Sequence, residues 1–400
     1  MTRRVERQES VSPNQRLQGF SLIELMVALT VFLVVSIASL SLFSRHETLL
    51  SREQGVAGLN IGLRSALSQI QIDTVNAGNG QIAGPEVPAW PVGVTISNSN
   101  PTAAQCYTAA TFSATNVMLS PPNYASACFD TLNIVMVDAS TPPVHPMTST
   151  GACITTSSNT SFYGAMPSGY ASSTYATNFQ NGDQVIFVSA TAPTKYTTAL
   201  LTANGSSTTC ASLGSIPSCS TSYPSGFASL SYHVTGSGGT NTVSNDPISM
   251  TVNAPASALS ASFCSSDWVL RMKPITYSVI TTATVNGIED PQLVRAQSGT
   301  TNVVMDQVIG FKVGAAWWDN NTSTFAYCYN TGAYCDNANT IPGYNNDFTL
   351  IRSVRVTIIG RTTPSTDPTN NYRNPFDSGS YQIRGSSIVV DPRNLTMGND

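Results

Sequence analysis

Charged residues are scarce in this chain of 400 residues: Asp, Glu, Lys and Arg make up 10% of it, against about a quarter in a typical globular protein. A disordered, solvating chain is excluded all the same, because apolar residues account for 41%. The net charge of −4 offers no basic footprint for nucleic acid. Low charge with abundant Ser, Thr, Asn and Gly indicates an exported body of short strands and polar loops.

Histidine and catalytic motifs are also missing or rare. The only histidines are His46, His145 and His233, and we expect each to be structural. No C-x-x-C pair, H-E-x-x-H, G-x-S-x-G, Walker A loop or dinucleotide fingerprint occurs, so neither a zinc site, a cofactor nor an enzyme is predicted. Oxygen-bearing residues at 319–321 and 336–339 lack EF-hand spacing, and calcium binding there stays open.

What the chain does have is one long apolar run near its start. Residues 1–19 are polar and carry four arginines against two glutamates, a net of +2, and residues 20–43 then hold a single charge. As a helix, those 24 residues span about 36 Å, enough to cross a hydrocarbon layer of ~30 Å. The arginines predict that the leader 1–19 stays in the cytoplasm and that the chain after residue 44 lies outside.

An amphipathic pattern continues this helix over residues 44–79. Apolar residues recur every seventh position, at Leu42, Leu49, Val56, Leu63 and Ile70. We therefore expect one helix from Phe20 to about Val75, weakened by three glycines at about 1 kcal/mol each. The run AGNG at 77–80 and Pro85 end it.

Beyond the helix the pattern is that of β-structure, and residues 80–400 form the expected globular head. The candidate strands are Val92–Ile96, Thr131–Val137, Asp183–Val188, Leu230–Val234, Trp268–Met272, Ile275–Ile280, Gln292–Arg295, Val303–Val313, Leu350–Ile359 and Ser387–Val390. Long polar intervals at 97–127 and 139–226 are interpreted as loops or insertions of unassigned role. The predicted fold class is α+β, with a long N-terminal helix packed on a mostly antiparallel sheet.

All eight cysteines lie beyond the helix. They are Cys106, Cys128, Cys153, Cys210, Cys219, Cys264, Cys328 and Cys335. An even number in an exported region predicts disulfides formed in an oxidising compartment. Eight cysteines allow 105 pairings, so connectivity is not predicted, although short spacing favours Cys210–Cys219 and Cys328–Cys335 as local bridges.

The string GFSLIELMVAL at 19–29 holds the feature that most calls for a function. Glu24 is a carboxylate inside an otherwise apolar helix, which costs several kcal/mol in a membrane and marks a functional site. An ordinary secretory signal has an apolar core of only 7–15 residues and a small-residue cleavage site. A plain single-pass anchor needs neither Gly19 nor Glu24.

This string resembles the class III signal of type IV pilins and of type II secretion pseudopilins. The resemblance implies that a prepilin peptidase cuts between Gly19 and Phe20 and methylates the new amino group of Phe20. It also implies that Glu24 neutralises the Phe20 amine of a neighbouring subunit in a filament. Catalysis then belongs to the peptidase, and this chain is its substrate.

Later segments resemble PilW-type minor pilins and follow the order of that family. They are DTVNAGN at 73–79, DTLNIVMVD at 130–138, NGDQVIFVSA at 181–190, ITYSVI at 275–280, PQLVRA at 291–296, NVVMDQVIGFKVGAAW at 302–317, SVRVTIIGRT at 353–362 and VVDPRNLTMGN at 389–399. The family has fewer cysteines and shorter loops than this chain.

The resemblance implies a minor pilin that helps to initiate a type IV pilus and sits at or near its tip. Its expected partners are the prepilin peptidase, other minor and major pilins, and the inner membrane with its assembly platform; no nucleic acid is expected. It would begin as a single-pass inner-membrane protein with a periplasmic head and end in the pilus. The alternatives are a minor pseudopilin of type II secretion and a pilus-borne adhesin.

Overall fold

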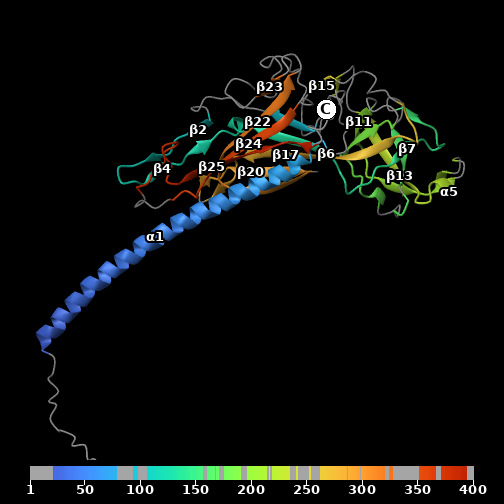
Figure 1. Ribbon diagram of the computed structural model, residues 1–400. Coiled ribbons are helices and arrows are strands. Elements are labelled where there is room, and N and C mark those ends of the chain that lie inside the picture. The colour runs from blue at the N-terminus through green and yellow to red at the C-terminus, as the bar shows by residue number, and fades with distance from the viewer. Residues whose placement is uncertain are drawn as a thin grey trace, which may run out of the picture. The chain divides into compact units, whose positions relative to one another are not determined.

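The computed structural model (Figure 1) describes most of the helix and the head. The described residues are 21–78, 93–97, 106–155, 160–166, 168–170, 175–190, 196–213, 216, 219–234, 240–241, 252–253, 262–285, 287–297, 299–319, 324–327, 351–365 and 371–393. The chain forms two compact units, residues 1–57 and 58–400, and each is described by itself.

A single helix, α1 (Leu22–Val75), runs from the first unit into the second. In the first unit its apolar side chains over residues 22–43 are all exposed. In the second unit its apolar stripe is buried, with Leu63, Ala66 and Ile70 at most 2% exposed. The three glycines do not interrupt it, because the tertiary packing of this stripe outweighs their weak helix propensity.

The head contains two antiparallel sheets that, with α1, enclose one hydrophobic core. We call this part the core lobe. Its first sheet has 11 strands among the described residues, of which five lie in this lobe: β1 (Val94–Ser97), β6 (Thr131–Val137), β17 (Trp268–Ile280), β20 (Gln292–Gln297) and β21 (Thr300–Met305). Its second sheet has the order β23 (Thr324–Tyr327), β22 (Val308–Asp319), β24 (Ile351–Arg361) and β25 (Ile383–Val390). Short elements complete it: β2 (Tyr107–Thr108), β3 (Thr111–Phe112), β4 (Met118–Ser120), β5 (Asn123–Tyr124), η1 (Ser126–Cys128), β18 (Thr284–Val285) and β19 (Ile288–Glu289). The α+β prediction is confirmed.

A second lobe is inserted between two neighbouring strands of the first sheet. We call residues 139–270 the inserted lobe; they leave the end of β6 and return in β17, although β6 and β17 pair directly through Val137 and Met272. Its elements are β7 (His145–Met147), β8 (Ile154–Thr155), β9 (Ser161–Ala165), β10 (Gln184–Val188), β11 (Tyr196–Leu201), β12 (Ser206–Thr208), α4 (Cys210–Leu213), α5 (Cys219–Ser222), β13 (Phe227–Val234), β14 (Thr240–Asn241), β15 (Val252–Asn253) and β16 (Ser262–Phe263). In Figure 1 these elements carry the green and yellow colours.

The inserted lobe has a hydrophobic core of its own. That core contains Phe162, Phe179, Phe187 and Phe263, all at most 1% exposed, and it shares no residue with the core beneath α1. Of the two interpretations that the sequence left open for 139–226, loops or insertions, the structure shows an insertion, which is folded and extends to residue 270. Inside it, sequence patterns predicted strands at Asp183–Val188 and Leu230–Val234, whereas the shorter strands among polar stretches were missed.

Two strand predictions also need correction. Trp268–Met272 and Ile275–Ile280 are one strand, β17, and Pro274 lies inside it opposite Val135. Val303–Val313, predicted as one strand, is two: β21 and β22 are separated at Asp306–Gln307, where Gln307 has a positive φ of 56°. A non-glycine residue in that conformation marks a tight turn that apolar patterning does not reveal.

Three disulfides link the described cysteines: Cys106–Cys128, Cys153–Cys264 and Cys210–Cys219. The last is the local bridge that its spacing favours. Cys153–Cys264 spans 111 positions and lies wholly in the inserted lobe. Cys328 and Cys335 lie outside the described residues, as do 336–339 of the calcium-like stretches. Among the described residues no group of three or more His, Cys, Asp or Glu could hold a metal ion.

Candidate functional site

The first turn of α1 is built around Ser21 and Glu24. The backbone N–H of Ser21 donates to the Glu24 carboxylate (N–Oε2 3.0 Å), and the N–H of Glu24 donates to the Ser21 hydroxyl (N–Oγ 3.4 Å). This reciprocal arrangement is a capping box, which satisfies backbone donors that a helix N-terminus leaves unpaired. The sequence interpretation of Glu24 missed it, although the S-x-x-E spacing at 21–24 was readable.

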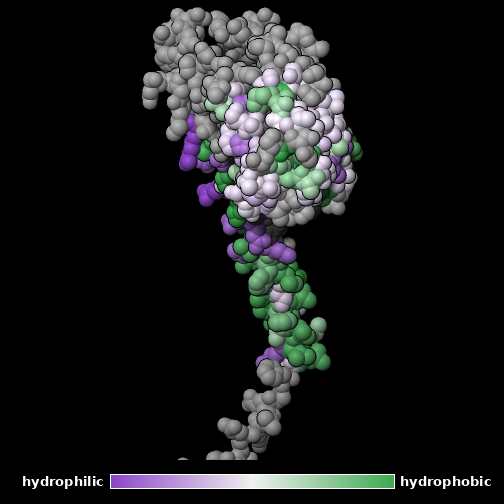
Figure 2. Space-filling model, turned by 90° about the vertical axis from the view of Figure 1, so that its right-hand side faces the viewer, coloured by the Kyte–Doolittle hydropathy of each residue, from purple (hydrophilic) through white to green (hydrophobic). Residues whose placement is uncertain are grey.

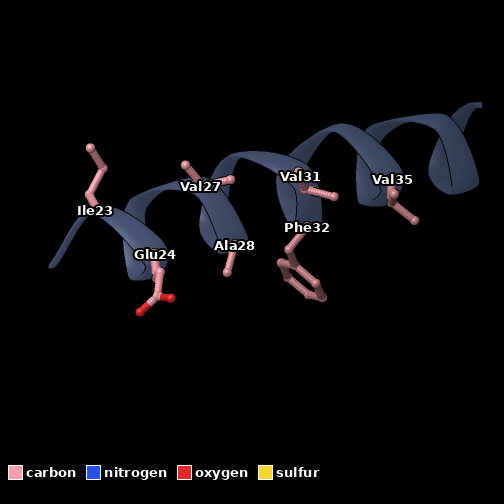
Figure 3. Close-up of a pocket in the computed structure, with 7 residues that line it drawn as sticks. All are labelled: Ile23, Glu24, Val27, Ala28, Val31, Phe32 and Val35. Carbon is pink, nitrogen blue, oxygen red and sulfur yellow. The ribbon is translucent and has the colours of Figure 1, made fainter. Parts of the chain in front are cut away.

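Apart from Glu24, the first part of α1 is uncharged and mostly apolar. Figure 3 shows Glu24 pointing to the same side of the helix as Ala28 and Phe32, beside a shallow surface groove. The groove is lined by Ile23, Glu24, Val27, Ala28, Val31, Phe32 and Val35. Such a stripe can pack against another apolar helix, and the carboxylate then lies at one end of the contact.

Glu24 keeps unused capacity to accept hydrogen bonds. A carboxylate has about four acceptor positions. Within the described part of the chain, the carboxylate of Glu24 accepts a hydrogen bond from the Ser21 N–H. Glu24 is also the only charged residue of Leu22–Phe43, the stretch of 22 residues that is long and apolar enough to span a membrane. The carboxylate of Glu24 is therefore accessible to a cationic group of another chain or of a segment that the structure does not describe. Gly19 and Phe20, the predicted cleavage pair, are themselves outside the described residues.

The opposite end of α1 is held to the core lobe by an ion pair between a buried aspartate and a partly buried arginine. Asp73, in the last turns of the helix, accepts hydrogen bonds from Arg295 on β20 (Nε–Oδ2 2.7 Å) and from the Tyr277 hydroxyl on β17 (2.5 Å). Burial by itself lowers the pKa of Arg295, but hydrogen bonding to Asp73 and its charge outweigh burial and raise it. Burial and Asp73 raise the pKa of Tyr277. The arginine also offsets the unfavourable placement of a carboxylate near a helix C-terminus.

Two further aspartates, Asp130 and Asp183, make similar contacts between strands. Asp130 accepts from Lys312 (Nζ–Oδ1 2.9 Å) and from the backbone N–H of Val313 (2.8 Å), which joins β6 to β22. Asp183 pairs with Arg271 (Nε–Oδ2 2.8 Å). These aspartates thus hold strands of the head together.

A buried arginine organises the far end of the core lobe. Arg361, 1% exposed, donates to Gln307 (Nε–Oε1 2.6 Å) and to the backbone carbonyl oxygen of Glu289, and its guanidinium lies 4.7 Å from the ring centre of Tyr381. The Tyr381 hydroxyl donates to the fully buried Asp377. These contacts bind the segment before β25 to the sheet. Sequence patterns give no signal for such a network, because its members are far apart in the chain.

Comparison with known families finds one match, which lies at the N-terminus. Residues 15–40 match the prokaryotic N-terminal methylation motif, and the match covers the capping box and most of the apolar run. No curated protein and no solved structure matches the chain. The motif implies processing by a prepilin peptidase and assembly with other pilins, and the apolar helix that follows suits a membrane anchor. Together they support a type IV pilin-like or pseudopilin protein, and the motif points to a structural kind of protein.

Proposed function

We propose that this chain is a minor pilin of the PilW type that is cut between Gly19 and Phe20, methylated at Phe20, and helps to initiate a type IV pilus. The observation that carries the proposal is the place of Glu24. It is the single carboxylate of an apolar helix, it lies in the first turn, and the methylation motif surrounds it. The exposed apolar stripe of α1 supports packing against other pilin helices in a filament core.

The proposed role of Glu24 goes beyond capping. Its carboxylate is held toward the start of the helix by the Ser21 N–H, one residue after Phe20. Cleavage would create a cationic amine at Phe20, and methylation leaves that amine charged. Glu24 of one subunit would then neutralise the amine of its neighbour and set the register between subunits. The leader would remain in the cytoplasm, and the head would face the periplasm before export in the pilus.

The proposal is tested by the N-terminus of the mature protein and by the phenotype of a deletion strain. Mass spectrometry should find a protein that begins at Phe20 and carries one added methyl group. The strain without this chain should lose surface pili and regain them when the gene is restored. A mature protein that begins elsewhere would overturn the processing scheme. Intact pili together with lost secretion of exoproteins would instead establish the alternative role, a type II secretion pseudopilin.

A further inference from the structure

The inserted lobe has almost no charge. Residues 139–270 number 132, of which 47 are Ser or Thr and four are charged, namely Asp183, Lys195, Asp246 and Asp267. An average stretch of this length would hold about 33 charged residues. The composition therefore departs strongly from that of an ordinary solvated surface.

The two charged residues that the structure describes in this lobe, Asp183 and Asp267, make an ion pair or hydrogen bonds within the protein. Asp183 pairs with Arg271 of β17. Asp267, 5% exposed, accepts from the backbone N–H groups of Ala190 (2.9 Å) and Cys264 (2.8 Å). Across the described residues of the lobe, no Asp, Glu, Lys or Arg other than these two occurs. The side of the head that faces the viewer in Figure 2 is accordingly mostly pale, as expected for Ser, Thr, Gly and Tyr.

Exposed aromatic rings interrupt this uncharged surface. Tyr170 is 45% exposed and is supported edge-on by Tyr175, with ring centres 5.3 Å apart. Trp268 is 38% exposed and lies 3.9 Å from the ring centre of His145. The Tyr175 hydroxyl donates to the carbonyl oxygen of Pro142, so both aromatic pairs border the same segment, residues 142–145.

We infer that the inserted lobe is a binding module for a neutral glycan, recognised around residues 142–145, Tyr170 and Trp268. Tyr, Ser, Gly and Asn are also the residues that binding loops of antibodies favour, since rigid rings supply contact area and small polar groups adapt their hydrogen bonds. A lobe with so few charged residues gives little attraction to acidic polymers, whereas sugars present hydroxyl groups and apolar ring faces. This inference goes beyond the proposed function and does not depend on the pilus.

The register of β6 and β17 allows the inserted lobe to be replaced by a turn, with loss of the pairing between β10 and the start of β17. Asp138 and Arg271 face each other at the end of the β6–β17 ladder, where the Asp138 N–H donates to the Arg271 carbonyl (2.8 Å). A variant in which Asn-Gly replaces residues 139–270 closes β6 and β17 with a two-residue hairpin turn. Removal of only 139–182 would instead cut β7 and β9 away from β13 and unfold what remains of the lobe.

The test applies the full-length protein in detergent micelles to an array of neutral, sialylated and sulfated glycans. We expect a neutral glycan to be bound, with less than a two-fold change in Kd between 50 and 500 mM KCl, because no ionic contact is involved. Tyr170→Ala should weaken binding about ten-fold. The matched control, Tyr372→Ala, changes an exposed tyrosine of the core lobe and should leave Kd within about two-fold.

The Asn-Gly variant should lose glycan binding and still be cut before Phe20. Binding restricted to acidic glycans, a steep salt dependence, or no neutral glycan bound would each overturn the inference. So would binding that Tyr170→Ala leaves unchanged, a result that does not require the deletion variant to fold. Processing at Phe20 is scored separately, so failure of the inference is distinguishable from failure of the proposed function.

Discussion

The carboxylate of Asp73 is joined to the guanidinium of Arg295 over 2.7 Å, which connects the end of α1 to β20. Their side chains are 9% and 16% exposed. The first belongs to the DTVNAGN segment and the second to PQLVRA, two stretches 222 positions apart. One ion pair therefore joins two segments that are distant in the sequence.

This pair yields a stability prediction. Asp73→Ala leaves the partly buried Arg295 cation without its carboxylate and the Tyr277 hydroxyl without its acceptor, which should cost about 2 kcal/mol. In urea unfolding of the detergent-solubilised protein, the urea concentration at the midpoint should be lower for Asp73→Ala than for the wild type, in proportion to this loss of stability. Arg384→Ala, which removes an exposed arginine of β25, serves as the control and should stay within about 0.5 kcal/mol. Equal effects of the two changes would contradict the structural role of the pair.

Glu24 can be divided into its two roles by substitution. Glutamine still reaches back to the Ser21 N–H as a capping-box residue, but it has no charge. If capping is all that Glu24 does, Glu24→Gln should support pili and Glu24→Leu should not. If Glu24 neutralises the Phe20 amine, both variants should be inserted and processed yet fail to assemble with other pilins. Surface pili and co-purification of pilins, scored in a strain without the native copy, separate these outcomes.

We expect cleavage after residue 19 to require a side chain as small as that of Gly19. Gly19→Val should leave an uncut, membrane-bound precursor, because the peptidase requires a small residue before the bond it cuts. Gly19→Ala, the smallest change available, should retain part of the cleavage. Mass spectrometry of the N-terminus measures both. Normal cleavage of the valine variant would mean that another bond or another enzyme is involved.

The disulfides should differ in their contribution to stability according to loop length. Removal of Cys153–Cys264, which closes 111 positions, should cost about 4–5 kcal/mol, and removal of Cys210–Cys219, which closes nine, about 2–3 kcal/mol. Paired serine variants measured by thermal unfolding under oxidising conditions test this order. Alkylation of the wild-type protein without reductant should find few or no free thiols. A reversed order would indicate that native-state strain outweighs loop entropy.

Acid should weaken the ion pair between Asp138 and Arg271, which lies where the inserted lobe leaves the core lobe. Burial by itself raises the pKa of Asp138, but hydrogen bonds from Ser140 and the charge of Arg271 lower it below its ordinary value of 3.8. A carboxylate with a lowered pKa stabilises the fold above its unfolded pKa, and this stabilisation is lost as the pH falls through the folded value. As the pH is lowered below about 4, the Tm of the wild-type protein should therefore decrease. The Tm of Asp138→Asn should decrease less steeply over the same pH range. Parallel profiles for both proteins would count against the contribution of Asp138.

Local patterns predicted the helix and most of the core-lobe strands, because both have strong apolar periodicity. Thr131–Val137 has the predicted bounds, since its β-branched residues are flanked by clear breaks. The joined strand β17 was missed because proline usually ends a strand, whereas Pro274 is tolerated here. The inserted lobe was missed because its order rests on pairings between distant strands, such as β9 with β13. No local signal reports such contacts.

The connection between β6 and β17 has a consequence for the order of folding. Val137 and Met272 are neighbours in the sheet, yet 135 positions separate them along the chain. Closing a loop of that length costs about 3 kcal/mol more than closing a hairpin of four residues. If the inserted lobe forms first, it brings the two ends together and converts a slow, long-range search into a local one. Oxidation of Cys153–Cys264 would then set the pace at which the central strands of the core lobe meet.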